Sequence, residues 1–242
     1  MRDMATILPL TAERLVFEAD GKRLIDSVGL TVGYGERIAF IGPNGAGKTL
    51  TLRMLHGLLA PTEGTVRWSR DDGTVAGRKR HAMVFQKPVM LRRTARANVV
   101  HALAAAGHGR TEAADRADAA LRRFGLDRLA SRPARLLSGG EQQRLAIARA
   151  AALEPELLFL DEPSSALDPG ATRQIEEMLG DLHAAGVALV FATHDLGQAR
   201  RIADRVAMFH NGRIVETGCA ADVLDRPVTA EAKAFVSGDL LW

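Results

Sequence analysis

Eight consecutive residues have the types and spacing that bind phosphate groups. Residues 42–49 read GPNGAGKT, which fits G-x-x-x-x-G-K-[ST], and they lie between a strand-like and a helix-like segment. Glycines let backbone N–H groups curl around phosphates, and the start of the following helix adds a favourable dipole. The alternative, a glycine-rich turn without a ligand, does not require this context. The candidate phosphate-binding residues are Gly42, Pro43, Asn44, Gly45, Ala46, Gly47, Lys48, Thr49 and Leu50.

Two side chains of this segment have specific chemistry. Lys48 is expected to reach the β- and γ-phosphates of a nucleotide, and Thr49 to offer its hydroxyl to Mg²⁺. Lys48 therefore also counts as a catalytic residue, because it would stabilise the charge that develops during phosphoryl transfer.

Two adjacent acids supply the second half of this chemistry. Four apolar residues, 157–160, predict a buried strand that delivers Asp161 and Glu162 to the carboxyl edge of a sheet, where α/β proteins bind ligands. Asp161 is expected to hold Mg²⁺ through water. Glu162 points differently, because strand side chains alternate, and is placed to orient or deprotonate an attacking water. Adjacent acids at a strand end are often only solvated, but beside a phosphate loop they predict a Mg²⁺-dependent nucleotide hydrolase.

A second helix start has the features of an anion site. Residues 136–150 read LLSGGEQQRLAIARA. Ser138 and Glu141 fit a capping box, so the plain interpretation is that Ser138 caps a helix. A cap does not explain the consecutive glycines Gly139 and Gly140, which free the backbone for a close approach. The simplest resolution is a head-to-tail pair of chains, in which each nucleotide lies between one phosphate loop and the partner's Ser138 loop.

The elements that must position these residues alternate between strand-like and helix-like runs, which favours an α/β fold. Expected strands are 35–42, 63–68, 81–86, 156–163, 187–194 and a hairpin over 205–218 that turns at Asn211-Gly212. Expected helices are 48–59, interrupted by Gly57, and 171–186.

A different composition marks the middle of the chain. From about residue 98 to 153 it is rich in Ala, Arg and Leu and has no strong strand signal. We therefore predict one domain, 1–242, with an α/β core at about 1–87 and 153–242 and a helical insert at about 88–152. Residues 87–150 hold 13 Lys and Arg against 5 Asp and Glu. Most of these charges are expected on a solvated surface, and the alternative is a face toward an anionic neighbour.

Composition excludes several classes of protein. At 242 residues the chain is long enough for a sizeable core, and its 47% hydrophobic and 25% charged residues are ordinary for a soluble globular protein. Cys219 is the single cysteine, so no disulfide can form within the chain, which suits a reducing compartment. The first ten residues lack the features of a secretory signal, and the longest apolar stretch, 184–192, is too short to span a bilayer.

The segment LSGGEQQRLAIARA resembles the signature of ATP-binding cassette (ABC) ATPases, and the other motifs of that family occur in order. GPNGAGKT resembles its Walker A loop and LLFLDE its Walker B strand with the catalytic glutamate. SALD at 165–168 resembles the D-loop, which places Asp168 at the nucleotide interface. Gln86 matches the glutamine loop, a Mg²⁺ and water contact, and His194 the switch histidine at the γ-phosphate. The resemblance implies a P-loop ATPase core with an inserted helical subdomain and an antiparallel β subdomain.

Taken singly, these residues have ordinary explanations. Gln86 is a common type of strand-end residue, and His194 alone is more often structural than catalytic. Asp168 followed by Pro169 is a good helix start, with Asp as N-cap and Pro at the first helical position. The ordered set is what favours the family.

Two positions depart from the family pattern. Glu141 stands where the family more often has glutamine, which adds negative charge near a phosphate. The family also stacks an aromatic residue on adenine, and the matching position here is Ala19, which leaves Phe17 as the candidate.

The resemblance implies partners and a cellular place. The chain resembles the separate ATP-binding subunit of an importer, which is a peripheral protein at the cytoplasmic face of the inner membrane. Such a subunit binds ATP and Mg²⁺, pairs with a second copy of itself, and works with a transmembrane permease and, indirectly, a solute-binding protein, but with no nucleic acid. The segment 86–103, which would grip the permease, resembles that of oxyanion importers, especially for tungstate, with phosphate and molybdate relatives.

Three alternatives stay open at this point. The cassette could serve an exporter or a lipoprotein-extraction complex, or it could regulate a membrane partner without moving solute. A soluble DNA-repair or translation ATPase is the third, but the former needs a long coiled coil and the latter two tandem cassettes, and neither fits this chain.

Overall fold

The computed structural model describes residues 6–70, 74–75 and 78–239. Its centre is a six-stranded sheet with the order β11-β10-β3-β9-β8-β7. Five of these strands are parallel and β11 is antiparallel to β10. The strands are β3 (Arg37–Ile41), β7 (His81–Val84), β8 (Leu157–Asp161), β9 (Ala188–Ala192), β10 (Arg205–His210) and β11 (Arg213–Cys219).

Residues alternate between two apolar cores, one on each face of this sheet. Ile38 and Phe40 of β3 join one core, and Ala39 and Ile41 join the other. The first core includes helix α1 (Lys48–His56) and a three-stranded antiparallel sheet, β2-β1-β4. That sheet consists of β1 (Leu10–Ala19), β2 (Lys22–Val32) and β4 (Glu63–Trp68). Both faces of the central sheet are covered, which explains its nearly continuous apolar strands.

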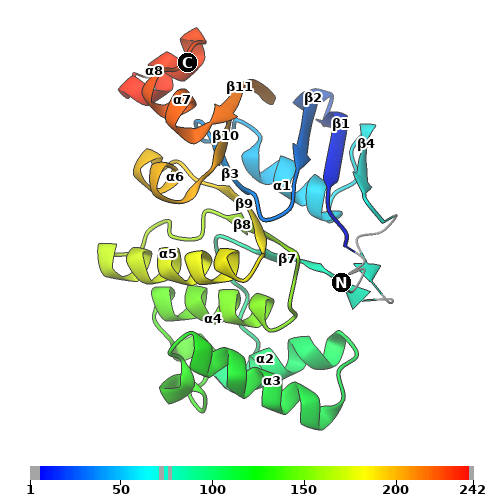
Figure 1. The fold of residues 1–242 in the computed structure, drawn as a ribbon, viewed down its shortest axis with the longest axis vertical. Helices are drawn as coiled ribbons and strands as arrows, with labels where there is room; N and C mark the ends of the chain where they lie inside the picture. The colour runs from blue at the N-terminus through cyan, green and yellow to red at the C-terminus, as the bar shows by residue number, and fades with distance from the viewer. Residues whose placement is uncertain (1–5, 71–73, 76–77, 240–242) are drawn as a thin grey trace.

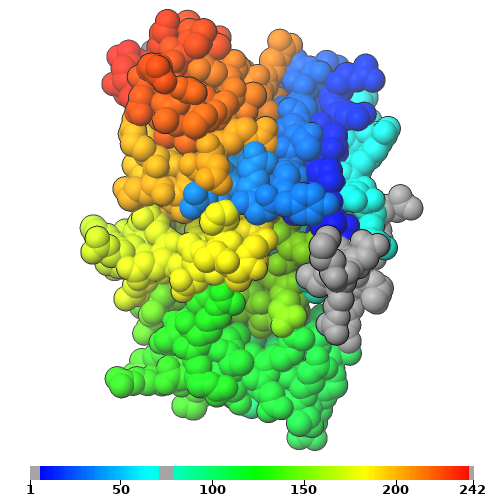
Figure 2. Space-filling view, viewed as in Figure 1, coloured from blue at the N-terminus to red at the C-terminus, as the bar shows by residue number. Residues whose placement is uncertain are grey.

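Helices cover the other face of the central sheet. They are α4 (Gly139–Ala151), α5 (Pro169–Ala184), α6 (Leu196–Ile202), α7 (Ala220–Asp225) and α8 (Ala230–Ser237). With α2 (Ala95–Ala105) and α3 (Arg110–Arg123), α4 forms the helical part at the bottom of Figure 1, opposite the C-terminal helices. In Figure 2 this green part forms the lower end of the molecule, and yellow residues separate it from the orange and blue upper half. The helices α2–α4 lie within the segment 88–152 that the sequence predicts as an insert.

Short elements complete the described chain. They are the two-stranded pair β5 (Thr74–Val75) and β6 (Arg78–Lys79) and the 3₁₀ turns η1 (Asp127–Leu129) and η2 (Ala134–Leu136). Among the described residues no helix is long and apolar enough to cross a membrane.

Several predicted element ends are wrong. The helix predicted over 48–59 stops at His56, because Gly57 adopts the left-handed conformation (φ 81°) and its N–H bonds back to Arg53 and Met54. The strand predicted over 81–86 ends at Val84, so Gln86 lies in a loop. The helix predicted over 171–186 begins two residues earlier, at Pro169, and ends at Ala184. The interpretation of Asp168 as its N-cap, with Pro169 at the first helical position, is confirmed, because Asp168 accepts from the Ala171 N–H. The other expected strands are each shorter by a few residues at their ends, except β4, which matches, and the Asn211-Gly212 hairpin is confirmed.

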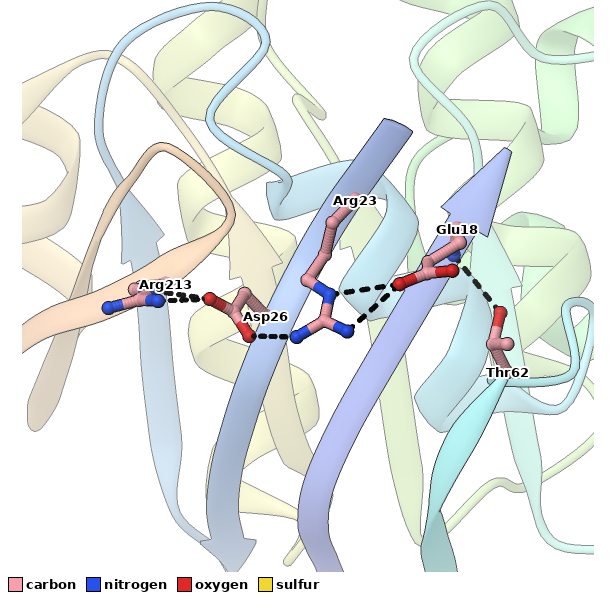
Figure 3. Close-up of polar contacts among 5 residues, drawn as sticks. All are labelled: Glu18, Arg23, Asp26, Thr62 and Arg213. Carbon is pink, nitrogen blue, oxygen red and sulfur yellow. Dashed lines mark hydrogen bonds and ion pairs between the residues drawn. The ribbon is translucent and has the colours of Figure 1, made fainter. Parts of the chain in front are cut away.

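A row of alternating charges joins the antiparallel sheet to the central one (Figure 3). Arg23 pairs with Glu18 at 3.0 Å and with Asp26 at 3.2 Å, and Asp26 also pairs with Arg213 of β11. The guanidinium of Arg213, and then that of Arg23, hold the pKa of Asp26 below its usual range. The backbone N–H of Glu18 donates to Thr62 Oγ1, just before β4. This row holds β1 and β2 against the β10–β11 hairpin, close to the phosphate loop.

His56 ends α1 in a confined position. Its ring makes edge contacts with His81 and Phe159, with centroids 4.7 Å and 5.8 Å away. Burial, helped by the charge of Lys79, lowers the pKa of His56 from 6.5 to about 4. The folded protein therefore keeps this imidazole neutral where the unfolded chain would protonate it.

This difference predicts a loss of stability in acid. Between pH 6.5 and 4 the unfolded chain binds more protons at His56 than the folded protein does, so the free energy of unfolding falls as the pH falls. The full effect is up to about 3 kcal/mol. In urea unfolding at pH 7 and pH 5, His56→Leu should lose less stability than the parent protein. His101→Leu, at an exposed position of α2, is the control and should behave like the parent. An equal loss in the His56 variant would contradict this account.

Candidate functional site

The phosphate loop connects β3 to α1 and depends on three glycines with positive φ. Gly42, Gly45 and Gly47 have φ values of 134°, 80° and 105°. A Cβ atom on Gly42 would lie 2.1 Å from the carbonyl oxygen of Phe209, and one on Gly47 would lie 2.5 Å from Ile25 Cδ1. The backbone of Phe209 therefore excludes a side chain at Gly42, whereas at Gly47 a Cβ would displace the end of the Ile25 side chain and strain the backbone. The loop ends at the α1 N-terminus, where the first turn carries no acid, so the helix dipole favours an anion.

Lys48 lies within this loop with only 6% of its surface exposed. Its Nζ donates to the carbonyl oxygens of Gly42 at 2.7 Å and Pro43 at 2.9 Å. Burial lowers the pKa of Lys48, while the charges of Glu162 and Asp161 oppose that shift. An ammonium group has three N–H donors, so one is left for a further acceptor. A phosphate oxygen fits this remaining donor in charge and chemistry.

Thr49 and Asp161 meet although they are 112 residues apart. Thr49 Oγ1 donates to Asp161 Oδ1 at 2.7 Å. Asp161 ends β8 and is 5% exposed, with the fully buried residues 157–160 before it. A hydroxyl and a carboxylate side by side form an oxygen donor set of the kind that Mg²⁺ prefers. The residues present therefore fit this metal ion.

Glu162 and His194 form the second polar pair of the site. Glu162 follows β8 with φ 47°, and its N–H donates to the carbonyl oxygen of Ala192 at 3.0 Å. Its Oε2 lies 2.7 Å from His194 Nδ1. An ionised carboxylate only accepts, so Nδ1 carries the hydrogen in this contact. The left-handed backbone at Glu162 costs about 1–2 kcal/mol and turns its side chain out of the line of β8, toward the loop after β9.

Most of these groups line one cavity of about 440 Å³. Gly42, Pro43 and Asp161 do not line it, and Asp161 is linked to it by its hydrogen bond with Thr49. Gln86 reaches it from the loop after β7, where its Nε2 donates to Ser165 Oγ at 3.1 Å. The residues that line the cavity are Asn44, Gly45, Ala46, Gly47, Lys48, Thr49, Leu50, Gln86, Glu162 and His194. The structure thus brings together four parts of the sequence that the motifs predicted separately: the phosphate loop, Gln86, Glu162 and His194.

The Ser138 loop lies elsewhere in the chain, at the start of α4, and does not line this cavity. The capping box is present, with Ser138 Oγ accepting from the Glu141 N–H and Glu141 Oε2 accepting from the Ser138 N–H. Contact of these residues with the nucleotide of a second copy stays a prediction, and Gly140 also has a role within the chain. A Cβ atom there would lie 3.0 Å from Ala171 Cβ, so this glycine permits close packing of α4 on α5 within the chain. At Gly139 a Cβ would meet only an ordinary contact, Leu167 Cδ2 at 3.8 Å.

Two further predicted residues lie outside the cavity. Asp168 caps α5, with its Oδ1 accepting from the Ala171 N–H at 2.9 Å. Phe17 is half-buried on β1 and packs against the core next to the antiparallel sheet. Contact of either residue with a nucleotide stays a prediction.

Sequence reasoning missed the polar contacts behind the cavity. Ser165 receives the amide of Gln86, and its neighbour Ser164 accepts from Gln198 Nε2 at 2.7 Å. Gln198 is fully buried on α6, four residues after His194. No spacing in the sequence indicates these contacts, because the partners are 79 and 34 residues apart.

Comparison with known proteins identifies the family. A family model described as ABC transporter matches residues 25–165. The chain belongs to the ABC transporter family. It is 39% identical to the phosphate import ATP-binding protein PstB 2 of Natronomonas pharaonis, over 92% of this chain and 84% of that protein. It is also 39% identical to the cobalt import ATP-binding protein CbiO of Rhodobacter capsulatus, over 92% and 83% of the two chains.

Solved structures show the same fold. The structure of cbiO1 from Clostridium perfringens, part of the ABC transporter complex cbiONQ, matches with a TM-score of 0.80 and 27% identity over 91% of each chain. A structure of the ATP-binding subunit of an ABC transporter matches with a TM-score of 0.79 and 27% identity, over 96% of this chain and 99% of that one. The fold is the ABC cassette, and the protein is an ATPase whose ATP hydrolysis is coupled to transport.

The loop geometry predicts unequal effects of alanine at two of its glycines. Gly42→Ala should lower the free energy of unfolding by more than about 3 kcal/mol and abolish ATP binding, because the new Cβ meets the Phe209 carbonyl in a conformation that L residues avoid. Gly45→Ala is the matched control. Its Cβ would meet nothing within 4 Å, so only the left-handed strain of about 1–2 kcal/mol applies. Urea unfolding and nucleotide titration measure both, and equal losses would contradict the packing argument.

Proposed function

We propose that this protein is the ATP-hydrolysing subunit of an ABC importer, and that two copies enclose two ATP molecules. The observation that carries the proposal is the single cavity where the phosphate loop, Gln86, Glu162 and His194 converge. Relatives named as import ATP-binding proteins for phosphate, cobalt, anions and methionine support the direction of transport.

Each side chain of the cavity has a proposed role. Lys48 and the N–H groups of the phosphate loop bind the β- and γ-phosphates, since they present donors in a partly dry site. Glu162 accepts a proton from the attacking water or orients it, and His194, paired with Glu162, lies where it can contact the γ-phosphate. Thr49 and Asp161, with Gln86, would hold Mg²⁺. When bound, that ion neutralises charge on the phosphate oxygens.

The second copy is proposed to supply its Ser138 loop. The N-terminus of α4 offers free N–H groups from a 13-residue helix, and Gly139 leaves its backbone open. Glu141 is less of an obstacle than its charge suggests, because its Oε2 accepts from the Ser138 N–H at 2.8 Å and so caps its own helix. Phe17 remains the proposed contact for adenine.

The permease is proposed to bind beside the loop after β7. A cleft of about 560 Å³ opens there between β7 and the helices α2 and α4, with apolar walls and arginines at its edge. It adjoins the segment 86–103 that the family resemblance assigns to this contact. Binding there would place the chain at the cytoplasmic face of the membrane, as a peripheral subunit, with a solute-binding protein as an indirect partner.

The proposed cargo is an oxyanion, with tungstate first and phosphate or molybdate next. The segment 86–103 resembles that of oxyanion importers, and two relatives are named for phosphate and anion import. Other relatives of similar identity are named for cobalt and methionine, so the proposed cargo depends on the resemblance of the segment 86–103 alone.

Replacing the proposed base tests the mechanism. Glu162→Gln should keep ATP binding and lower kcat by at least about a hundredfold, because general base catalysis typically contributes that much. Without hydrolysis the closed pair should persist, so size-exclusion chromatography with ATP and Mg²⁺ should show a dimer. Glu177→Gln, an exposed position on α5, is the control and should hydrolyse ATP like the parent. A monomeric Glu162 variant with normal turnover would overturn the assignment of Glu162.

Transport substrate is tested in the full complex. The protein is co-purified with its permease, and ATPase activity is measured with binding proteins loaded with tungstate, molybdate, phosphate, cobalt or methionine. Stimulation by tungstate or another oxyanion is the expected result. Stimulation by cobalt or methionine alone would overturn the cargo but keep the importer, and the absence of any permease partner would overturn both.

A further inference from the structure

Three side chains of the helical part hold the backbone on both sides of Gln86. Arg149 Nη1 donates to the carbonyl oxygen of Val89 at 3.0 Å, and Arg135 Nε donates to that of Met90 at 3.0 Å. Gln143 Nε2 makes a longer contact, 3.4 Å, with the carbonyl oxygen of Phe85. The carbonyl groups just before Gln86 and three and four residues after it are thus held by η2 and α4.

The two arginines use their charge for this purpose. Among the described residues, neither has a carboxylate within ion-pair distance, although most other charged contacts of the helical part are arginine–acid pairs such as Arg96 with Asp118. The guanidinium of Arg149 is partly desolvated, and this burial lowers its pKa. A partly buried cation needs acceptors, and hydrogen bonds from a charged donor are about twice as strong as neutral ones. For Arg149 the acceptor is the Val89 carbonyl of the loop.

Few contacts of Gln86 itself fix its position. Gln86 is exposed and lies outside any strand or helix, and among the described residues its side chain makes one hydrogen bond, to Ser165. The end of the loop is fixed separately, because the buried Asn98 accepts from the Leu91 N–H at 2.9 Å. The position of Gln86 at the cavity therefore depends on the backbone that carries it.

We infer that Arg149 and Arg135 are positioning residues for ATP hydrolysis, which act by holding the Val89 and Met90 carbonyls so that Gln86 faces the cavity. The inference rests on the proposed function of Gln86. It assigns a role in the active site to two side chains that do not line the nucleotide cavity and that belong to the helical part of the chain. ATP binding should be little affected, since neither arginine lines the cavity and their described hydrogen bonds go to Val89 and Met90.

The test compares Arg149→Met with Arg123→Met in the full-length protein. Methionine keeps the aliphatic part of the side chain and removes the donors. Arg123 is the matched control, because it also joins the helical part to a backbone carbonyl, that of Asp181 at 3.0 Å, but far along α5 from the loop. Arg149→Met should lower kcat about 5- to 20-fold with the KM for ATP within about twofold, whereas Arg123→Met should change neither.

A second measurement does not depend on activity. Hydrogen exchange of the nucleotide-free protein should show faster exchange of the backbone over 85–91 in Arg149→Met and no change there in Arg123→Met. Arg135→Met should give the same direction in both measurements. If Arg149→Met loses activity while exchange over 85–91 is unchanged, the arginine does not act through the loop.

A double-mutant cycle separates positioning from general stability. Because Arg149 is inferred to act through Gln86, Arg149→Met should cause no further loss of kcat in a Gln86→Ala background. Additive losses would overturn the inference. Its failure is distinguishable from that of the proposed function: if Glu162→Gln abolishes turnover but Arg149→Met leaves kcat unchanged, only the inference about the arginines is wrong.

Discussion

The parallel register of three central strands is the constraint on which the site depends. Phe40 of β3 pairs with Ala192 of β9, and Asp161 of β8 pairs with the same residue from the other side. The chain therefore leaves all three strands at one edge of the sheet, and the next residues are the phosphate loop, Glu162 and His194. A slip of one residue would turn every apolar side chain to the opposite core and separate Asp161 from Thr49.

Backbone conformations that most residues avoid give this edge its shape. The phosphate loop can pack on the Phe209 backbone because Gly42 lacks a side chain, and Gly47 lies close to the end of the Ile25 side chain. Glu162 is a carboxylate with φ 47°, held there by the hydrogen bond from its N–H to Ala192. At Glu162 an unfavourable local conformation is thus stabilised by pairing on the sheet, and its carboxylate faces the cavity as a result.

Several arginines of the basic helical part make contacts within the chain rather than facing an anionic partner. Some of its arginines pair with acids of the same part, such as Arg116 with Glu154. Others, Arg135 and Arg149, contact carbonyl groups of the loop that carries Gln86. The excess of positive charge over residues 87–150 is therefore partly an internal requirement, since guanidinium groups can satisfy several backbone acceptors at once.

Local patterns in the sequence determined much of this protein. Glycines with a lysine after a strand, apolar runs that end in acids, and Asn211-Gly212 each act through the geometry of a few neighbouring residues, so the phosphate loop, the strand cores and the hairpin could be predicted. Element ends were less predictable. The cap at Asp168 could be recognised from the sequence, but the strand ends depend on where pairing with neighbouring strands stops. Only the tertiary structure decided that Gln86 bonds to Ser165, that Gly140 packs on Ala171, and that Arg149 holds Val89. Those contacts join distant segments, and their distances follow from how the sheet and helices pack rather than from any spacing along the chain.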